Sequence, residues 1–425
     1  QLRSDINLKK INMAIVKPFK GIRPPREVAE EVACLPYDVM NAEEAREMAK
    51  GNEKSFLHIT RSEIDLNEDI DVHSQEVYDK SRNNFNEFMN KGWLKEEEKP
   101  KFYIYAQTMN NKTQYGIVGA AAVDDYLNGI IKKHELTRPD KEEDRMKIIR
   151  ENSADLEPVF FTYPAVREID EVVEGVVKNQ DPVYDFVADD GFGHHFWVVE
   201  QDETNNKIEQ LFKDKVPYTY VADGHHRTAA AALVGKEKRE NNPNHTGNEA
   251  YNYFMAVHFP DNQLQILDYN RVVKDLNGNT SGEFIEKLKE SFEIEEKGAE
   301  PYRPEKLHNF GMYLEGKWYS LTAKPGTYDD NDPIGVLDVT ILTNQVLEPI
   351  LNIQDLRRSK RIDFVGGIRG LKELERRVEN GDMKVAFALY PVSLKQLIDI
   401  ADTGNIMPPK TTWFEPKLRS GLVVY

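Results

Sequence analysis

The sequence predicts a mixed α/β protein of the α+β kind, and three observations support this fold class. A strand-forming run, 216–221, is followed by Asp-Gly and then by helix-forming residues up to 233. Two alternating apolar runs around Asn110-Asn111 predict a β-hairpin over 101–123. After residue 276, helix-forming and strand-forming segments alternate, which favours a separate α+β domain.

The length predicts several domains, because 425 residues are too many for one ordinary core. Residues 1–12 are polar, and we interpret them as a tag or an upstream extension. The remaining chain divides on composition into three parts. These are an N-terminal α/β segment (13–100), a central domain (101–275) and a C-terminal α+β domain (276–425).

The composition is typical of a soluble globular protein, with 40% hydrophobic and 30% charged residues. The formal net charge of −17 argues against broad binding to nucleic acid or to an anionic membrane, because both would repel the chain. No apolar run approaches the roughly 20 residues that span a bilayer. Cys34 is the only cysteine, which excludes an internal disulfide and favours a reducing compartment. We therefore expect a cytoplasmic protein that binds a small anionic or hydroxylated metabolite; the oligomeric state stays open, with a homodimer among the options.

The first half of the chain switches between helical and strand periodicity. Apolar residues at helical spacing, such as Val77, Phe85 and Phe88, predict helices, which glycines such as Gly51 and Gly92 end. We expect helices at 26–32, 42–49, 75–91, 140–153, 169–177 and 204–213, with Asp140 as the cap of the fourth. Strands are expected at 15–19, 55–60, 101–107, 113–123, 159–163, 183–187, 195–199 and 216–221.

The second half continues the same alternation. Runs 253–259 and 264–268 flank Pro260-Asp-Asn and predict a hairpin. Helices are expected at 283–291, 339–347, about 371–380 and 392–402, and strands at 310–314, 317–321, 385–389 and from 362 into a Gly-Gly turn. The proline-rich stretch 407–417 is expected to lack regular structure and to pack onto the body of the protein.

The first candidate site lies where the strand 216–221 gives way to a helix, at Asp223, Gly224, His225, His226 and Arg227. The first N–H groups of a helix have no partner within it and its dipole is positive there, so an anion is favoured. Gly224 permits close approach of a ligand, and Arg227 offers two prongs to a phosphate or carboxylate. Asp223 can cap the helix, take a proton or bind a metal. Adjacent histidines on a helix point about 100° apart, so we expect only one to face the ligand. The alternative is a purely structural turn and cap.

The second candidate site begins where His134 and Glu135 leave an apolar strand for a loop. A carboxylate beside a histidine is a plausible pair of base and orienting group. In the helix that follows, Lys141, Asp144 and Arg145 share one face, and Lys141 or Arg145 can clamp a phosphate. The alternative is an ordinary solvated helix. A third cluster, His194-His195, follows a hairpin loop and is interpreted as structural or surface-exposed.

Short motifs spread along the chain resemble those of a known family. They are Pro36-Tyr-Asp-Val39, Ser55-Phe-Leu-His58, Lys133-His-Glu-Leu-Thr137 with Lys141 and Asp144-Arg145, Ala222-Asp-Gly-His-His-Arg227, Phe364-Val-Gly-Gly367 and Met407-Pro-Pro-Lys410. Together they resemble domain-of-unknown-function family 1015, an uncharacterised bacterial and archaeal family, over nearly the whole chain from Met13. That family carries no established activity.

The segment Asp223-Gly-His-His-Arg227 also resembles a motif of free-serine kinases in the ParB/sulfiredoxin superfamily. In that superfamily a strand–turn–helix with a Gly-x-x-Arg-like signature holds nucleotide phosphates. The resemblance implies a ParB/sulfiredoxin-like nucleotide-binding core with the C-terminal α+β domain added to it. It also implies Mg²⁺ and a nucleotide, ATP or ADP, as cofactors.

Three functions fit these residues. The first is a phosphotransferase, most simply a free-serine kinase; the second is a phosphoserine phosphatase; the third is a nucleotide-binding regulator without turnover. The absence of a Walker-type P-loop disfavours an ordinary NTPase. We expect an enzyme with catalytic residues Glu135, His134, Asp223 and His225, phosphate or nucleotide contacts at Gly224, His226, Arg227, Lys141 and Arg145, and Mg²⁺ on Asp223 or Asp144.

Overall fold

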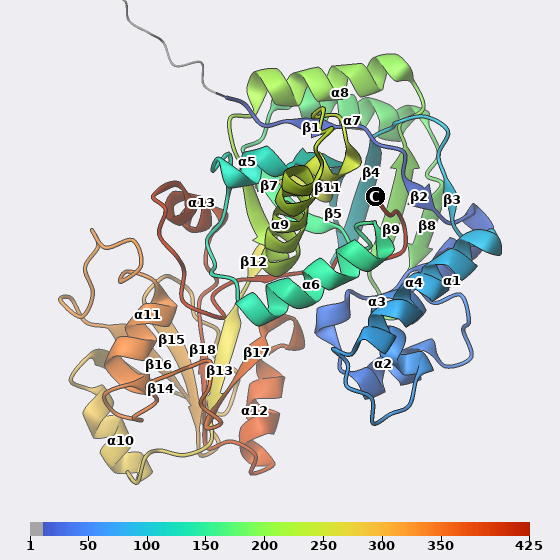
Figure 1. The fold of residues 1–425 in the computed structure, drawn as a ribbon. Helices are drawn as coiled ribbons and strands as arrows, with labels where there is room; N and C mark the ends of the chain where they lie inside the picture. Colours follow the sequence, from blue (N-terminus) through green and yellow to red (C-terminus); the bar gives the residue numbers. More distant parts are fainter. Residues whose placement is uncertain (1–11) are drawn as a thin grey trace, which may run out of the picture. The chain divides into compact units, whose positions relative to one another are not determined.

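The computed structural model describes residues 12–425, and the predicted extension lies outside the described residues except for its last position. The chain forms two compact units, one made of the described part of Gln1–Leu264 with Pro416–Tyr425, the other of Gln265–Glu415. Each unit contains a sheet together with helices (Figure 1). This confirms the predicted mixed α/β class.

The first unit is built on a nine-stranded mixed sheet in the order β6-β10-β7-β11-β5-β4-β9-β8, with β1 paired to β5. Its strands are β1 (Val16–Lys17), β4 (Tyr103–Met109), β5 (Lys112–Ala122), β6 (Ile131–Lys132), β7 (Val159–Tyr163), β8 (Tyr184–Val187), β9 (Gly193–Val198), β10 (Thr219–Asp223) and β11 (Tyr253–Pro260). β10 runs parallel to β6. The segments that follow these two strands therefore leave the sheet at the same edge.

The predicted hairpin of β4 and β5 is confirmed, with the two strands paired from Tyr103–Val118 to Met109–Lys112. Asn110 and Asn111 adopt φ angles of 51° and 62°. Two consecutive residues with positive φ make the tight turn whose twist matches that of the flanking strands.

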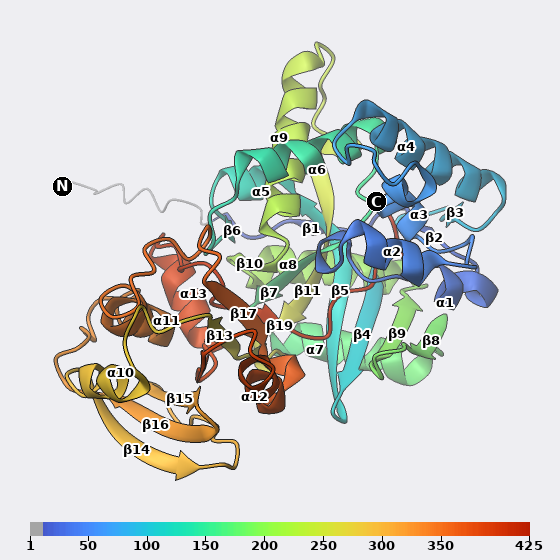
Figure 2. The same ribbon diagram turned by 90° about the horizontal axis from the view of Figure 1, so that it is seen from below.

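The first unit has two groups of helices, one at the N-terminus and one later in the chain. The later group comprises α5 (Val123–Leu127), α6 (Pro139–Asn152), α7 (Arg167–Asn179), α8 (Asp202–Lys215) and α9 (His225–Asn241). The N-terminal group comprises α1 (Ala29–Val32), α2 (Ala42–Ala49), α3 (Leu57–Thr60) and α4 (Gln75–Asn90) with short 3₁₀ turns at Arg26–Val28, Tyr37–Val39 and Ser62–Asp65, and a small two-stranded sheet of β2 (Ile22–Arg23) and β3 (Lys95–Glu96). Figure 2 shows α6 running beside α9, and α6 contacts both α9 and α4.

Two predictions in this unit are wrong in detail. The segment 55–60 is not a strand: Leu57–Thr60 forms one helical turn, and the N–H of Phe56 donates to the carbonyl of Val32 at 2.9 Å. Phe56, Leu57 and Ile59 are all buried, and a short apolar run of this kind does not distinguish a strand from a buried helical turn. The cap of α6 is Arg138 rather than Asp140, because Pro139 occupies the first helical turn, where its missing N–H has no cost.

The second unit contains a six-stranded antiparallel sheet in the order β14-β16-β15-β18-β13-β17. The strands are β13 (Tyr269–Val273), β14 (Phe292–Gly298), β15 (Asn309–Leu314), β16 (Lys317–Ala323), β17 (Ile362–Gly366) and β18 (Val385–Ala388). The helices are α10 (Ser281–Leu288), α11 (Asp338–Leu342) continued by a π-helical turn (Thr343–Leu347), α12 (Leu371–Glu379) and α13 (Leu394–Asp402), with a 3₁₀ turn at Gly367–Arg369.

The hairpin predicted for 253–268 is wrong. β11 pairs with β5 and β7 in the large sheet, whereas β12 (Ile266–Leu267) pairs with β19 (Trp413–Phe414) from the end of the chain. Pro260 ends β11, and Asp261–Gln263 form a 3₁₀ turn instead of closing a ladder. The prediction that 407–417 lacks regular structure is therefore wrong at β19, whereas Met407 and Phe414 are buried as expected.

Candidate functional site

The parallel pairing of β6 and β10 brings the two predicted sites together. The residues His134 and Glu135 follow β6, and the turn at Gly224 follows β10. His225, the first residue of α9, faces both members of the pair that follows β6. One site therefore gathers residues that lie about 90 positions apart in the sequence.

The start of α9 has the geometry expected of an anion-binding helix terminus. Gly224 is the residue before the helix and adopts φ +90°, and no described side chain caps the first turn. The N–H of Thr228 donates to the carbonyl of Gly224 at 2.9 Å and closes that turn. A methyl group on Gly224 would meet Nη2 of Arg227 at 3.2 Å and Val159 at 3.3 Å. Only glycine fits this position without strain.

Arg227 is held at the site by backbone and charge. Its Nη1 donates to the carbonyl of Pro158 at 2.7 Å. Burial lowers the pKa of Arg227, but the carboxylates of Asp38, Glu157 and Asp223 outweigh it and raise the pKa above its usual value. The guanidinium is therefore permanently charged, and one of its two terminal nitrogens is hydrogen-bonded to the protein.

Asp223 has a cationic partner that the sequence did not reveal. Its Oδ2 lies 3.1 Å from Nζ of Lys417, and its Oδ1 accepts from the N–H of Gly224 at 2.9 Å. Burial alone would raise the pKa of Asp223, but the charges of Lys417 and Arg227 lower it, so the carboxylate is ionised. A metal ion on this carboxylate stays a prediction, and within the structure Lys417 is the cation beside it.

His134, Glu135 and His225 form a compact cluster. Oε2 of Glu135 lies 3.6 Å from Nδ1 of His225, and the two imidazole rings are 4.5 Å apart with their planes at 90°. Burial lowers the pKa of His134 to about 4. Burial also lowers the pKa of His225, and the neighbouring His134 lowers it further. Both imidazoles are therefore neutral at pH 7.

His226 points elsewhere, as the spacing of adjacent helical residues predicts. Its Nε2 accepts a hydrogen bond from the N–H of Arg138 at 3.2 Å. Burial lowers the pKa of His226; the carboxylates of Glu142 and Asp38 oppose this, while the charge of Lys141 adds to it. Lys141 thus brings positive charge towards the α9 terminus from the exposed side of α6.

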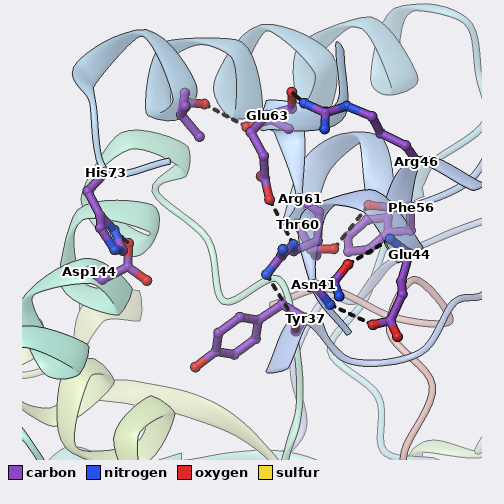
Figure 3. Close-up of polar contacts among 12 residues, drawn as sticks. Tyr37, Asn41, Glu44, Arg46, Phe56, Thr60, Arg61, Glu63, His73 and Asp144 are labelled. Atoms are coloured by element: carbon purple, nitrogen blue, oxygen red, sulfur yellow. Dashed lines mark hydrogen bonds and ion pairs between the residues drawn. The ribbon is translucent and has the colours of Figure 1, made fainter. Parts of the chain in front are cut away.

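Asp144 and Arg145 lie on the same helix but bind other parts of the protein. Arg145 donates to Asp144 at 2.6 and 3.0 Å, and its guanidinium stacks 3.7 Å from the ring of Tyr37. The Asp144 carboxylate also accepts from Tyr78 at 2.5 Å and lies 3.1 Å from His73. Figure 3 shows His73 beside Asp144. The binding of a phosphate by Arg145 and of a metal by Asp144 stays a prediction. In the structure, both side chains are engaged by protein groups.

The loop around Tyr37 contributes to the site and was not among the predicted site residues. The N–H of Tyr37 donates to Oε1 of Glu157 at 3.0 Å, and Arg61 donates to the carbonyl of Tyr37 at 3.2 Å (Figure 3). Glu63 holds Arg61 through an ion pair of 2.9 Å. The Pro36-Tyr-Asp-Val39 motif was the signal that could have found this loop, whereas Lys417 and Glu157 stand in no recognisable motif.

A small cavity of about 30 Å³ lies beside Arg145, Glu157 and Arg227. It holds about one water molecule. Glu135 is more open to solvent, with a side chain that is 42% exposed.

The third histidine cluster lies in β9, and both histidines contact side chains of the protein. The buried His194 has Nδ1 2.7 Å from the hydroxyl of Tyr105, and His195 has Nδ1 2.7 Å from Asp185. Across residues 12–425, no helix combines the length and the apolar character needed to cross a bilayer.

Comparisons with known proteins identify a family. A family model described as "Protein of unknown function (DUF1015)" matches residues 16–340. The search of curated proteins found no match.

Solved structures give weak similarities. A free serine kinase in complex with AMP has 12% identity and a TM-score of 0.35, over 72% of this chain and 91% of its own. A conserved hypothetical protein from Pyrococcus furiosus has 15% identity and a TM-score of 0.34, over 72% and 95%. C-terminally truncated SbnI from Staphylococcus aureus has 12% identity and a TM-score of 0.37, over 72% and 85%. At these scores the similarities carry no argument about the activity of this chain.

Proposed function

Because the chain belongs to the DUF1015 family, whose description names no activity, we propose its function from the site alone. We propose that the protein transfers a phosphoryl group from a nucleotide to the hydroxyl group of a small metabolite. Serine is the first acceptor to test.

The observation that carries this proposal is the position of Glu135. Its carboxylate lies 3.6 Å from the buried His225, at the start of a helix whose first turn no described side chain caps. A hydroxyl group beside Glu135 and a phosphate group at the helix terminus would therefore be neighbours. Such proximity is the main requirement for phosphoryl transfer.

The surrounding charges support a phosphate at the helix terminus. Arg227 is permanently charged, and Lys141 lies close enough to His226 to lower its pKa. These cations and the first N–H groups of α9 would bind the phosphate oxygens. Gly224 has a positive φ and no side chain, so the backbone at the helix terminus is open to this contact.

The transfer forms one bond to phosphorus and breaks another. The acceptor oxygen forms a bond to the terminal phosphorus of the nucleotide, and the bond from that phosphorus to its bridging oxygen breaks. The hydroxyl proton passes to the Glu135 carboxylate, and the shortened nucleotide leaves with the bridging oxygen. His225, which is neutral, orients Glu135.

We expect Mg²⁺ to be required, because the charge on the transferred phosphoryl group must be neutralised. Lys417 already neutralises Asp223, and Asp144 is engaged by Arg145 and Tyr78. The nucleotide phosphates would therefore supply most of the ligands of the ion.

The test is to incubate the protein with serine, Mg²⁺ and ATP or ADP and to detect phosphoserine by ³¹P nuclear magnetic resonance. Phosphoserine formed only with nucleotide is the expected result. Hydrolysis of added phosphoserine without nucleotide would instead make the protein a phosphatase. Nucleotide binding with both metabolites unchanged would make it a regulator, and either outcome would contradict the proposal.

A further inference from the structure

The cluster of His134, Glu135 and His225 has the composition of a metal site. Each residue offers one ligand atom, and the three atoms lie within 4.8 Å of one another. One pair of these atoms, Oε2 of Glu135 and Nδ1 of His225, is 3.6 Å apart. Ligand atoms about 2.1 Å from a tetrahedral Zn²⁺ lie about 3.4 Å from one another, so the observed spacing needs only a small closure.

The two imidazoles are buried, and some of their ring nitrogens lack a hydrogen-bond partner. His134 is 1% exposed and His225 is 6% exposed. Within the described residues, Nε2 of His225 has no partner, and neither ring nitrogen of His134 makes a well-formed hydrogen bond, although the nearby Val221 backbone raises the pKa of His134. Buried polar atoms are nearly always paired, because an unpaired one loses the hydrogen bond that water would have supplied. Two buried, neutral imidazoles beside one carboxylate, with ring nitrogens left unpaired, form a ligand set suited to a transition metal ion.

We infer that His134, Glu135 and His225 bind a single divalent transition metal ion, with Zn²⁺ as the first ion to test. Two imidazoles and one carboxylate suit Zn²⁺ and its first-row neighbours, whereas Mg²⁺ and Ca²⁺ prefer oxygen ligands. Three protein ligands leave one coordination position for water or substrate. The exposed side of Glu135 provides access to that position.

This inference does not rest on the proposed phosphoryl transfer. The metal site follows from the arrangement of three side chains, and the protein can hold the ion whatever reaction it performs. With the ion bound, Glu135 serves as a ligand. The ion would then lower the pKa of a bound hydroxyl group, and the second oxygen of the Glu135 carboxylate would take the proton.

Metal binding is tested on the full chain in the absence of nucleotide and serine. The protein is stripped with a chelator, and Co²⁺ is titrated while its visible absorption reports coordination by nitrogen and oxygen ligands. Zn²⁺ is then added to displace Co²⁺. We expect one Co²⁺ per chain, with the intense spectrum of a four- or five-coordinate site, and full displacement by one equivalent of Zn²⁺.

Three variants locate the site. Glu135→Gln and His225→Asn are expected to weaken Co²⁺ binding by at least about 100-fold, since loss of a direct ligand costs more than loss of an outer-shell partner. His195→Asn, which alters a histidine–carboxylate pair elsewhere in the first unit, should bind Co²⁺ as the wild type does. Glu135 is partly exposed, so the Glu135→Gln protein should keep its fold even if the His225→Asn protein does not.

A wild-type protein that shows no Co²⁺ spectrum and takes up no Zn²⁺ would overturn the metal site. So would unchanged Co²⁺ binding by the folded Glu135→Gln protein. Failure of the phosphotransfer assay alone would leave the metal site standing.

Discussion

The replacement Gly224→Ala tests the geometry of the α9 terminus. Gly224 has φ +90°, and a side chain in this left-handed region costs roughly 1–2 kcal/mol. The new methyl group would also press on Arg227 at 3.2 Å and on Val159 at 3.3 Å, which adds on the order of 1 kcal/mol of overpacking. We therefore expect unfolding free energy to fall by about 2–3 kcal/mol.

Two matched glycine variants separate the causes. Gly129 has φ +79° with open space around its Cβ position, so Gly129→Ala should cost only the backbone strain, roughly 1 kcal/mol. Gly175 lies inside α7 with open space and an ordinary φ, so Gly175→Ala should stabilise by about 0.5–1 kcal/mol.

The assay is urea unfolding followed by circular dichroism, together with phosphotransfer measured on the same preparations. The Gly224→Ala protein should lose both stability and transfer, because its methyl group displaces Arg227. The reasoning is refuted if Gly224→Ala matches Gly129→Ala in stability and retains wild-type transfer.

Three further predictions follow from single contacts. Lys417→Met removes the cationic partner of Asp223, whose side chain is 37% exposed. We expect the free energy of unfolding in urea to fall by about 1 kcal/mol, less than for a fully buried pair. Unchanged stability would show that the pair does not stabilise the fold. Burial lowers the pKa of His258 to about 4 in the folded protein, whereas the unfolded chain has a pKa of about 6.5. The free energy of unfolding is therefore at its full value above about pH 6.5, and it falls by up to about 3 kcal/mol as the pH falls towards 4. His258→Gln should flatten the decline of melting temperature over that interval, and an equally steep decline would contradict it. In the second unit, Thr280→Ala removes the side chain that caps α10 and accepts a hydrogen bond from the N–H of Glu283 at 3.2 Å. The free energy of unfolding should fall by about 1 kcal/mol. Calorimetry that finds no change would argue against the cap.

Local sequence patterns predicted most of the elements but not their partners. The run 159–163 and the Asn110-Asn111 hairpin carry their own periodicity and turn chemistry, and the structure has both. The run 264–268 pairs with Trp413–Phe414 near the end of the chain, a choice that no local signal records. Tertiary packing also turned Leu57–Thr60 into a helix.

The candidate site shows the same limit. The segment Asp223–Arg227 and the pair His134-Glu135 could each be found from residue types at a strand end, and the parallel pairing of β6 and β10 explains why they meet. Lys417 could not be found, because it reaches Asp223 from 194 positions away. The roles of Asp144 and Arg145 also depend on neighbours, Tyr78 and Tyr37, that only the folded chain supplies.

The central claim is that a phosphoryl group is transferred beside Glu135, and the rate of phosphoserine formation by Glu135→Gln tests it most directly. Removing a catalytic base or a metal-held carboxylate should lower kcat by about 100-fold or more, while KM for the nucleotide stays near the wild-type value. The surface variant Glu171→Gln, which breaks only an exposed pair with Arg167, should keep the wild-type rate. A Glu135→Gln protein that forms phosphoserine as fast as the wild type would contradict the account.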